Sequence, residues 1–211
     1  AVEIAETVLG PSTKTPGQAL AERGAAVKHP VVFVPGFTSS ALELWRGEDC
    51  ATRSLSHRAR IYSGPAMMNL MGTNMRCFLY HMSLDPHTWS DPTGGGGDGG
   101  GGGGGGIDNS NSNNATTTTK QSARVKLRAA SGLTAADYFG GSMTGPARHL
   151  MFLWGKLVME LAHVGYGDDS MYMASFDWRL SPQELETRDH YFTRLRLAID
   201  ALRAASPTQE K

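Results

Sequence analysis

The clearest hydrophobic pattern in the chain is an unbroken apolar run at residues 31–34, which is followed by Pro35 and Gly36. A run without polar alternation is typical of a strand covered on both faces, as in a parallel sheet flanked by helices. Pro35 removes a donor from the ladder, and Gly36 permits a sharp turn. Ligands of such sheets bind beyond the carboxyl ends of the strands, so the backbone amides near Phe37 form a candidate site. An ordinary buried strand that ends in a turn would show the same pattern.

The second half of the chain alternates between the periods of helix and strand. Helices are predicted at residues 146–164 and 182–205, and short strands at residues 124–128 and 171–176. Gly165 is placed to end the first helix. Alternating helix and strand predicts an α/β fold.

The second of these helices has a clear start signal. Ser181 is a capping residue, Pro182 suits the first helical position, and Glu184 completes a capping box. Apolar residues at helical spacing then predict one buried face. They are Leu185, Phe192, Leu195, Ile199 and Leu202.

A segment of different composition separates the two halves. Residues 93–122 consist almost entirely of Gly, Asn, Ser and Thr, and they cannot bury enough apolar area to offset the entropy of ordering. They predict a disordered insertion in a surface loop. The glycine tract lacks the Gly-x-x-x-x-Gly-Lys-Ser/Thr spacing of a phosphate-binding loop, so no nucleotide cofactor is predicted.

Charge and cysteine content exclude several classes of function. The 20 basic and 20 acidic residues cancel, which argues against a nucleic-acid partner. No apolar run reaches the length of about 18 residues that indicates a membrane-spanning helix. Cys50 and Cys77 lie in no zinc-binding spacing, so no metal is predicted. Their spacing leaves open whether they are two free thiols or one disulfide.

Motifs along most of the chain resemble those of phospholipid:diacylglycerol acyltransferases, relatives of lecithin:cholesterol acyltransferase. The residues that carry the resemblance are 14–17 and 28–37, Leu42 to Trp45, Cys50, Cys77, Leu84 to Pro86, Asp91 and Pro92, Arg128 to Ala130, Asp137 to Phe139, Gly165 and Tyr166, Asp177 to Leu180, and Arg188 and Asp189.

The resemblance implies an enzyme that moves an acyl chain from the sn-2 position of a phospholipid to diacylglycerol, giving triacylglycerol and a lysophospholipid. A serine would form the acyl-enzyme, and an alcohol would accept the acyl group. The implied partners are phospholipid and diacylglycerol at a membrane surface, on the lumenal side of the endoplasmic reticulum or another lipid-synthesising organelle. No cofactor, metal or nucleic acid is implied, and the sequence does not indicate an oligomeric state.

The resemblance also implies roles for individual residues. Phe37 follows the Pro-Gly pair, and its N–H would help to form the oxyanion hole. Cys50 and Cys77 would form the disulfide that ties a lid loop. The lipid-contacting surface of the lid would comprise Trp45, Met67, Met68, Met71 and Met75, with Leu70 and Phe78 in the same cluster. Ordinary core packing is the alternative for the methionine cluster.

Asp177, Trp178 and Arg179 resemble a family signature, and we expect them to brace a strand end through an ion pair and an aromatic plug. The nucleophile, acid and base are expected outside the chain, because it contains no Gly-x-Ser-x-Gly elbow. Ser142, Asp177 and His190 satisfy the hydrolase order. However, no hydrophobic strand precedes Ser142, and His190 falls within a predicted helix. The expected fold is a partial α/β-hydrolase with a lid loop, truncated before the nucleophile elbow.

These interpretations divide the chain into four segments. They are an N-terminal extension at residues 1–27, the first core strand with oxyanion loop and lid at 28–92, the insertion at 93–122, and an α/β core segment at 123–211. Two other functions fit the same residues. A phospholipase A of this fold would pass the acyl group to water, and a non-catalytic fragment would bind lipid through the lid face.

Overall fold

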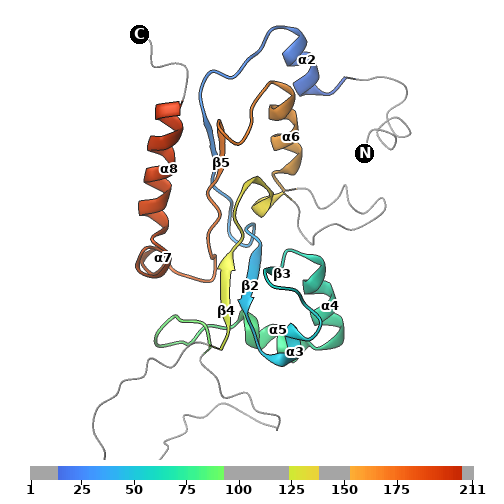
Figure 1. The fold of residues 1–211 in the computed structure, drawn as a ribbon, viewed down its shortest axis with the longest axis vertical. Coiled ribbons are helices and arrows are strands. Elements are labelled where there is room, and N and C mark those ends of the chain that lie inside the picture. Colours follow the sequence, from blue (N-terminus) through green and yellow to red (C-terminus); the bar gives the residue numbers. More distant parts are fainter. Residues whose placement is uncertain (1–13, 93–123, 138–152, 206–211) are drawn as a thin grey trace, which may run out of the picture.

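The structure, a computed structural model, describes residues 14–92, 124–137 and 153–205. Helices and strands are mixed in this part of the chain, in agreement with the predicted α/β class (Figure 1). The described strands form two sheets, one of two strands and one of three. The insertion at residues 93–122 lies outside the described residues.

The two-stranded sheet, which we call the parallel pair, consists of β1 (Val31–Phe33) and β5 (Met171–Met173). Each strand lies within a predicted one but is shorter. Figure 1 shows α6 (Gly155–His163) on one side of the pair and α8 (Tyr191–Ala205) on the other. β1 therefore has a parallel partner and flanking helices, as its sequence predicted.

β1 is nevertheless less covered than expected. Val31 and Val32 are only half-buried, Phe33 is buried, and Val34 is exposed beyond the end of the strand. The reason is the width of the sheet: within the described residues β1 pairs with β5 alone, and a two-stranded sheet leaves its margins open.

The core of the parallel pair combines three large residues with small ones. It comprises Phe33, Ala41, Ala130, Ala135, Ala136, Met171 and Met173. Two of the alanines belong to the short 3₁₀ helix η1 (Leu133–Ala136), which packs on β5. The N-terminal helix α2 (Pro16–Glu22) packs on α6. The Gly17 N–H donates a hydrogen bond to Glu160 Oε2 of α6 at 2.6 Å.

The three-stranded sheet places β2 (Leu42–Arg46) between β3 (Ala59–Tyr62) and β4 (Lys126–Ala129), with antiparallel pairing on both sides. The predicted strand at residues 124–128 is therefore present with its start shifted by two residues. β2 carries irregularities in both ladders, one of them between Leu44 and Arg46.

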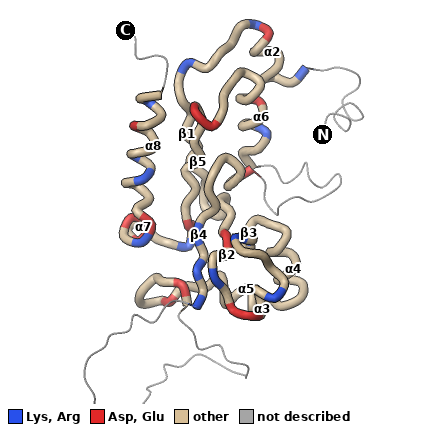
Figure 2. Tube along the Cα trace, viewed as in Figure 1, with Lys and Arg blue, Asp and Glu red and all other residues tan. Residues whose placement is uncertain are grey.

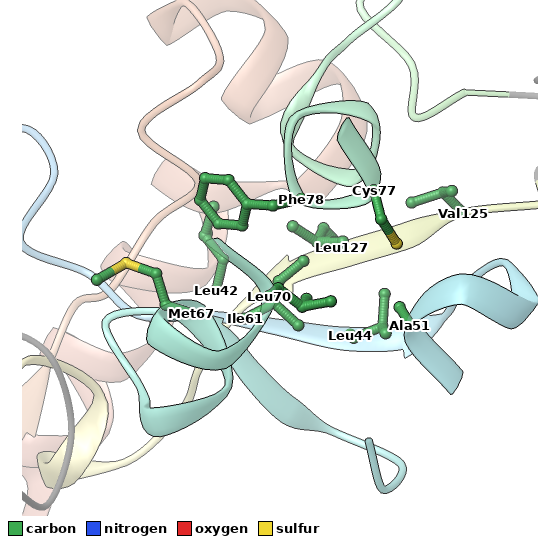
Figure 3. Packing of buried hydrophobic residues seen from close by; sticks show 10 residues of the cluster. All are labelled: Leu42, Leu44, Ala51, Ile61, Met67, Leu70, Cys77, Phe78, Val125 and Leu127. Atoms are coloured by element: carbon green, nitrogen blue, oxygen red, sulfur yellow. The ribbon is translucent and has the colours of Figure 1, made fainter. Parts of the chain in front are cut away.

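Three helices pack against this sheet: α3 (Asp49–Thr52), α4 (Pro65–Thr73) and α5 (Met75–Met82). We call the three strands and three helices the antiparallel body. Figure 3 shows its core, in which side chains from the strands meet those of the helices. The core comprises Leu42, Leu44, Ala51, Ile61, Met67, Leu70, Cys77, Phe78, Val125 and Leu127.

The predicted helix at residues 182–205 is in fact two helices, α7 (Pro182–Asp189) and α8. The Ser181 hydroxyl accepts a hydrogen bond from the Glu184 N–H, so the predicted start is correct. The break is at His190, which adopts the left-handed conformation with φ of 52° and caps α7. The expectation that His190 lies within a helix was therefore wrong.

The predicted buried face of the helix at residues 182–205 is largely open in α8. In α8, Leu202 is buried but Phe192 and Ile199 are exposed. The predicted helix at 146–164 is seen from Gly155 onward as α6 and ends before Gly165, whose φ is 104°. Residues 138–152 lie outside the described ranges. No helix in the described ranges is long and apolar enough to cross a membrane.

Candidate functional site

The loop after β1 presents Phe37 at the carboxyl end of the strand. A turn closed by the Ser39 N–H on the Gly36 carbonyl, at 3.1 Å, carries the chain away from the sheet, and Thr38 adopts a positive φ of 63°. The Phe37 side chain is 73 % exposed. Among the described residues none accepts a hydrogen bond from the Phe37 N–H. Within the described residues that N–H is thus a donor without an acceptor, at the edge of the sheet where ligands of parallel sheets bind.

An aromatic support holds this loop from the side. Trp178 stands edge-on to the Phe37 ring, with centroids 5.4 Å apart, and also contacts Tyr62 at 4.7 Å. The Trp178 indole N–H donates to the Ser40 carbonyl at 3.2 Å. Buried Ser40 in turn accepts from the Phe176 N–H through its hydroxyl. Trp178 therefore packs against the ring of Phe37 and is hydrogen-bonded to the loop that bears it.

Asp177 forms the centre of a buried ion-pair network beside this support. Its side chain is 0 % exposed, and Oδ2 accepts from Arg179 Nη2 and Arg188 Nη2, both at 2.7 Å. Burial by itself would raise the pKa of Asp177. Hydrogen bonds from Arg179 and the charges of both arginines outweigh burial and hold this pKa below its usual range. Asp177 is therefore an ionised carboxylate that is ion-paired with two guanidinium groups.

The network extends over segments that are far apart in sequence. Arg179 Nη2 also binds Asp91 Oδ1 at 3.0 Å, and Asp91 binds Arg128 of β4. Arg128 and Arg188 both contact Asp189. Figure 2 shows residues of both charges where α7 meets β4. Three aspartates and three arginines thus join the parallel pair, α7 and the antiparallel body at one place.

Arg179 also reaches the end of α5. Its Nη1 lies 3.5 Å from the His81 carbonyl and 3.4 Å from the Met82 carbonyl, where it can donate to both. Carbonyls at the end of a helix lack intrahelical partners and favour a cation. Asp177 and Arg179 thus form an ion pair just after β5, and Arg179 links this segment to the end of α5.

A cleft of about 540 Å³ lies between β4, the segment after β5 and the helices α7 and α8. Its walls carry aromatic side chains and guanidinium groups. They include Trp45, Tyr172, Phe176, Tyr191, Arg58 and Arg194. Such walls suit a ligand that has an apolar part and an anionic group.

The structure joins Cys50 of α3 to Cys77 of α5 in a disulfide, with an S–S distance of 2.13 Å and a Cα–Cα distance of 6.2 Å. This is the pairing that the family resemblance implied. The bridge closes a loop containing β3 and α4 and joins exposed Cys50 to Cys77 in the core of the antiparallel body. His81, which is fully buried, lies next to Cys77.

The predicted lid methionines separate into two groups. Met67 is buried in the core of the antiparallel body, which corrects its expected place on a surface and matches the core-packing alternative. Met68, Met71 and Met75 are exposed, and Leu79 extends the exposed group by one turn of α5. The spacing of three residues places Met68 and Met71 on one face of α4, and the spacing of four places Met75 and Leu79 on one face of α5.

Trp45 does not join the methionine surface. Leu42 and Leu44 face the helices, whereas Trp45 lines the cleft on the other side of the sheet. There Arg58 lies over its ring at 5.1 Å and Lys126 at 5.6 Å. Alternation along β2 and its irregularity after Leu44 account for the difference from the expected grouping.

The structure describes two of the three residues that satisfy the hydrolase order, Asp177 and His190. Ser142 lies outside the described residues. His190 is an exposed cap, and Asp177 is occupied by two arginines.

Sequence reasoning did not assign a role to several residues that the structure brings together. They are Asp91, Arg128, Arg188, Asp189 and His81. The first four belong to motifs that carry the family resemblance, and this was the signal that could have singled them out. The signal for His81 was its spacing of four residues from Cys77, which places both on one face of a helix.

Comparison with known proteins gives one family match and several close relatives. The model of the family "Lecithin:cholesterol acyltransferase" matches residues 107–210. "Phospholipid:diacylglycerol acyltransferase 1" of Arabidopsis thaliana is 34% identical over 94% of this chain and 23% of its own length. The Schizosaccharomyces pombe and Saccharomyces cerevisiae proteins named "Phospholipid:diacylglycerol acyltransferase" are 34% and 31% identical, over 82% and 87% of this chain. The chain spans less than a quarter of the length of these relatives.

Proposed function

Because the chain belongs to the lecithin:cholesterol acyltransferase family, we propose that it is part of an enzyme that moves an acyl group from a phospholipid to diacylglycerol. The products are triacylglycerol and a lysophospholipid. The observation that carries the proposal is the similarity of most of the chain to relatives whose names state this reaction. The N–H of Phe37 at a sheet edge supports it.

In this proposal the fold is that of an α/β-hydrolase, and Phe37 provides one donor of the oxyanion hole. A serine attacks the phospholipid ester, the tetrahedral oxyanion accepts hydrogen bonds from backbone N–H groups, and the lysophospholipid leaves. The hydroxyl of diacylglycerol then attacks the acyl-enzyme. The 211 residues contain no Gly-x-Ser-x-Gly elbow, so the nucleophile, acid and base come from outside them.

The disulfide-bridged loop is proposed as a lid that contacts the membrane surface. The exposed group of Met68, Met71, Met75 and Leu79 supports this role, because flexible thioethers adapt to irregular acyl chains. The bridge between Cys50 and Cys77 supports a lumenal or otherwise oxidising location, such as the endoplasmic reticulum.

One experiment separates acyl transfer from hydrolysis. The natural protein that contains this chain is incubated with vesicles of phospholipid labelled in the sn-2 acyl chain, with and without diacylglycerol. Label in triacylglycerol that depends on diacylglycerol supports the proposal. Label in free fatty acid alone, at either diacylglycerol content, would show a phospholipase of the same fold.

Lipid contact by the lid is tested by vesicle flotation of the chain. Met68→Ser with Met71→Ser removes apolar surface from the exposed group and is expected to reduce flotation. The matched control is Leu197→Ser with Ile199→Ser, which removes two similarly exposed apolar side chains from α8. Equal flotation of both variants and the original chain would argue against a lipid-contacting lid.

A further inference from the structure

The two sulfurs of the disulfide differ in their surroundings. Cys50 lies in the short helix α3 and is exposed, whereas Cys77 is 4 % exposed in the core of the antiparallel body. A thiolate from solution is therefore expected to attack at exposed Cys50 rather than at buried Cys77. In thiol–disulfide exchange the sulfur that is not attacked becomes the leaving group.

A buried hydrogen-bond donor faces the sulfur of Cys77. His81 Nε2 accepts from the Glu48 N–H at 3.1 Å, so in the neutral ring the proton is on Nδ1. Nδ1 lies 2.7 Å from the Cys77 carbonyl and 3.6 Å from Cys77 Sγ. Burial lowers the pKa of His81, which favours this neutral form. The Nδ1–H thus donates to the Cys77 carbonyl and lies close enough to Cys77 Sγ to be shared with a thiolate there.

We propose that this bridge is a site of thiol exchange, at which a small thiol becomes attached to Cys50 while Cys77 leaves as a thiolate beside His81. The incoming thiolate forms a new S–S bond to Cys50 Sγ as the Cys50–Cys77 bond breaks. The electron pair of the broken bond stays on Cys77 Sγ, which then accepts a hydrogen bond from Nδ1–H. The products are a mixed disulfide at Cys50 and a thiolate at Cys77. The reducing equivalent comes from the thiol, and a second thiol completes the reduction to two cysteines.

Two features favour Cys77 as the leaving group. The hydrogen bond from His81 stabilises the thiolate and opposes the cost of forming this charge in the core. Cys77 also lies in the first turn of α5, where the backbone N–H groups favour negative charge. A thiol with a lower pKa leaves faster, so both features accelerate attack on Cys50.

Cys50, Cys77 and His81 also resemble a set of metal ligands, since their ligand atoms lie within 4.8 Å of one another. In the structure the two sulfurs are bonded to each other, and both ring nitrogens of His81 have hydrogen-bond partners. These contacts favour the exchange site over a metal site.

Exchange would change the antiparallel body at one defined place. The bridge is the covalent link between α3 and α5, and the loop that it closes carries α4 with Met68 and Met71. Attachment of a thiol to Cys50 would free α3 and loosen this loop. The site is therefore a modification site whose state alters an exposed apolar surface, whether or not the protein transfers acyl groups.

The test uses the oxidised 211-residue chain and 2-mercaptoethanol, an uncharged thiol that avoids the carboxylates near Cys50. After short exposure, free thiols are blocked with an alkylating agent and the peptides of Cys50 and Cys77 are measured by mass spectrometry. We expect the product with the mercaptoethanol adduct on Cys50 and the alkyl group on Cys77 to exceed the product with the two groups exchanged by about tenfold. Adducts distributed evenly, or mainly on Cys77, would overturn the proposal. The chain unfolded in guanidinium serves as the reference, in which neither cysteine is expected to be attacked preferentially.

Two substitutions at His81 separate its donor from its packing. His81→Asn keeps a donor near the position of Nδ1, whereas His81→Gln keeps an acceptor near Nε2 for the Glu48 N–H and removes that donor. We expect His81→Gln to slow exchange about threefold to tenfold and His81→Asn to stay close to the original rate. Equal rates in all three proteins, or an equal loss in both variants, would exclude His81 as the group that stabilises the leaving thiolate.

Discussion

The antiparallel body and the parallel pair are held together by different means. The core of the antiparallel body is filled by large aliphatic side chains and is closed by a disulfide. Four of the seven core residues of the parallel pair are alanines, and the flanking helices leave large apolar residues such as Leu157 and Ile199 exposed. Apolar burial thus accounts for the order of the first region much better than for that of the second.

Charged residues supply part of the stabilisation that the small core of the parallel pair does not provide. Asp177 and Arg179, just after β5, bind Asp91, Arg188 and the carbonyls at the end of α5. A buried network is a costly way to fix a position unless every charge has a partner. The loop with Phe37 is therefore held by the Trp178 indole and by the neighbouring ion pairs rather than by a large core.

The largest effect is expected from Asp177→Asn. The substitution keeps the volume of the side chain but leaves the charges of Arg179 and Arg188 buried without their central partner. We expect a loss of about 3–5 kcal/mol in the free energy of unfolding, measured by urea denaturation. The control is Asp49→Asn, which removes an exposed partner of Arg53 and should change stability by less than about 1 kcal/mol. Equal effects of the two changes would contradict the role of the network.

The core of the antiparallel body is tested by Leu70→Ala. Leu70 is 1 % exposed, so the change leaves a cavity and should cost about 3 kcal/mol in urea denaturation. Met68→Ala on the same helix is the control, because Met68 is 55 % exposed and its loss should cost less than about 0.5 kcal/mol. If Leu70→Ala were as mild as Met68→Ala, the two regions would not differ as described.

A smaller effect is expected from Trp178→Phe. The aromatic ring against Phe37 is retained, but the hydrogen bond from the indole N–H to the Ser40 carbonyl is lost. We expect a loss of about 1 kcal/mol, measured as before. Trp89→Phe, a change at an exposed residue, should have little effect. A neutral result for Trp178→Phe would show that the loop does not depend on this hydrogen bond.

The smallest expected effect is a pH dependence of stability that arises from His81 in the antiparallel body. Burial lowers the pKa of His81, so between the folded and unfolded values only the unfolded chain takes up a proton at this residue. Stability should therefore fall as the pH decreases below about 6.5, the usual pKa of histidine. Urea midpoints between about pH 8 and about pH 5.5 should decrease more in the original chain than in His81→Gln. A decrease of equal size in both proteins would exclude His81 as its source.

Local features of the fold were predictable because their signals lie within a few residues. The cap at Ser181, the end of α6 before Gly165 and the position of β1 follow from short patterns of this kind. The break at His190 did not, because a left-handed residue other than glycine leaves no mark in an apolar pattern. Trp45 was assigned to the wrong surface, since an irregularity in β2 is not visible in the sequence.

The candidate site was predictable only in part for a related reason. Phe37 and Trp178 could be singled out one at a time, from a turn motif and from a family signature. The contact between Asp91 and Arg179 joins residues 88 positions apart, and no periodicity connects them. Such long-range polar contacts depend on how the two regions meet in the fold.

The central claim is that the N–H of Phe37 stabilises the oxyanion of acyl transfer. Phe37→Pro removes this N–H, whereas Phe37→Ala removes the ring and keeps the N–H. The measurement is kcat for transfer of labelled acyl groups to diacylglycerol by the natural protein that contains this chain, with urea denaturation to check that both variants fold. We predict that Phe37→Pro lowers kcat about 100-fold to 1000-fold and that Phe37→Ala lowers it less than about tenfold. Equal kcat values for the two folded variants would contradict the claim.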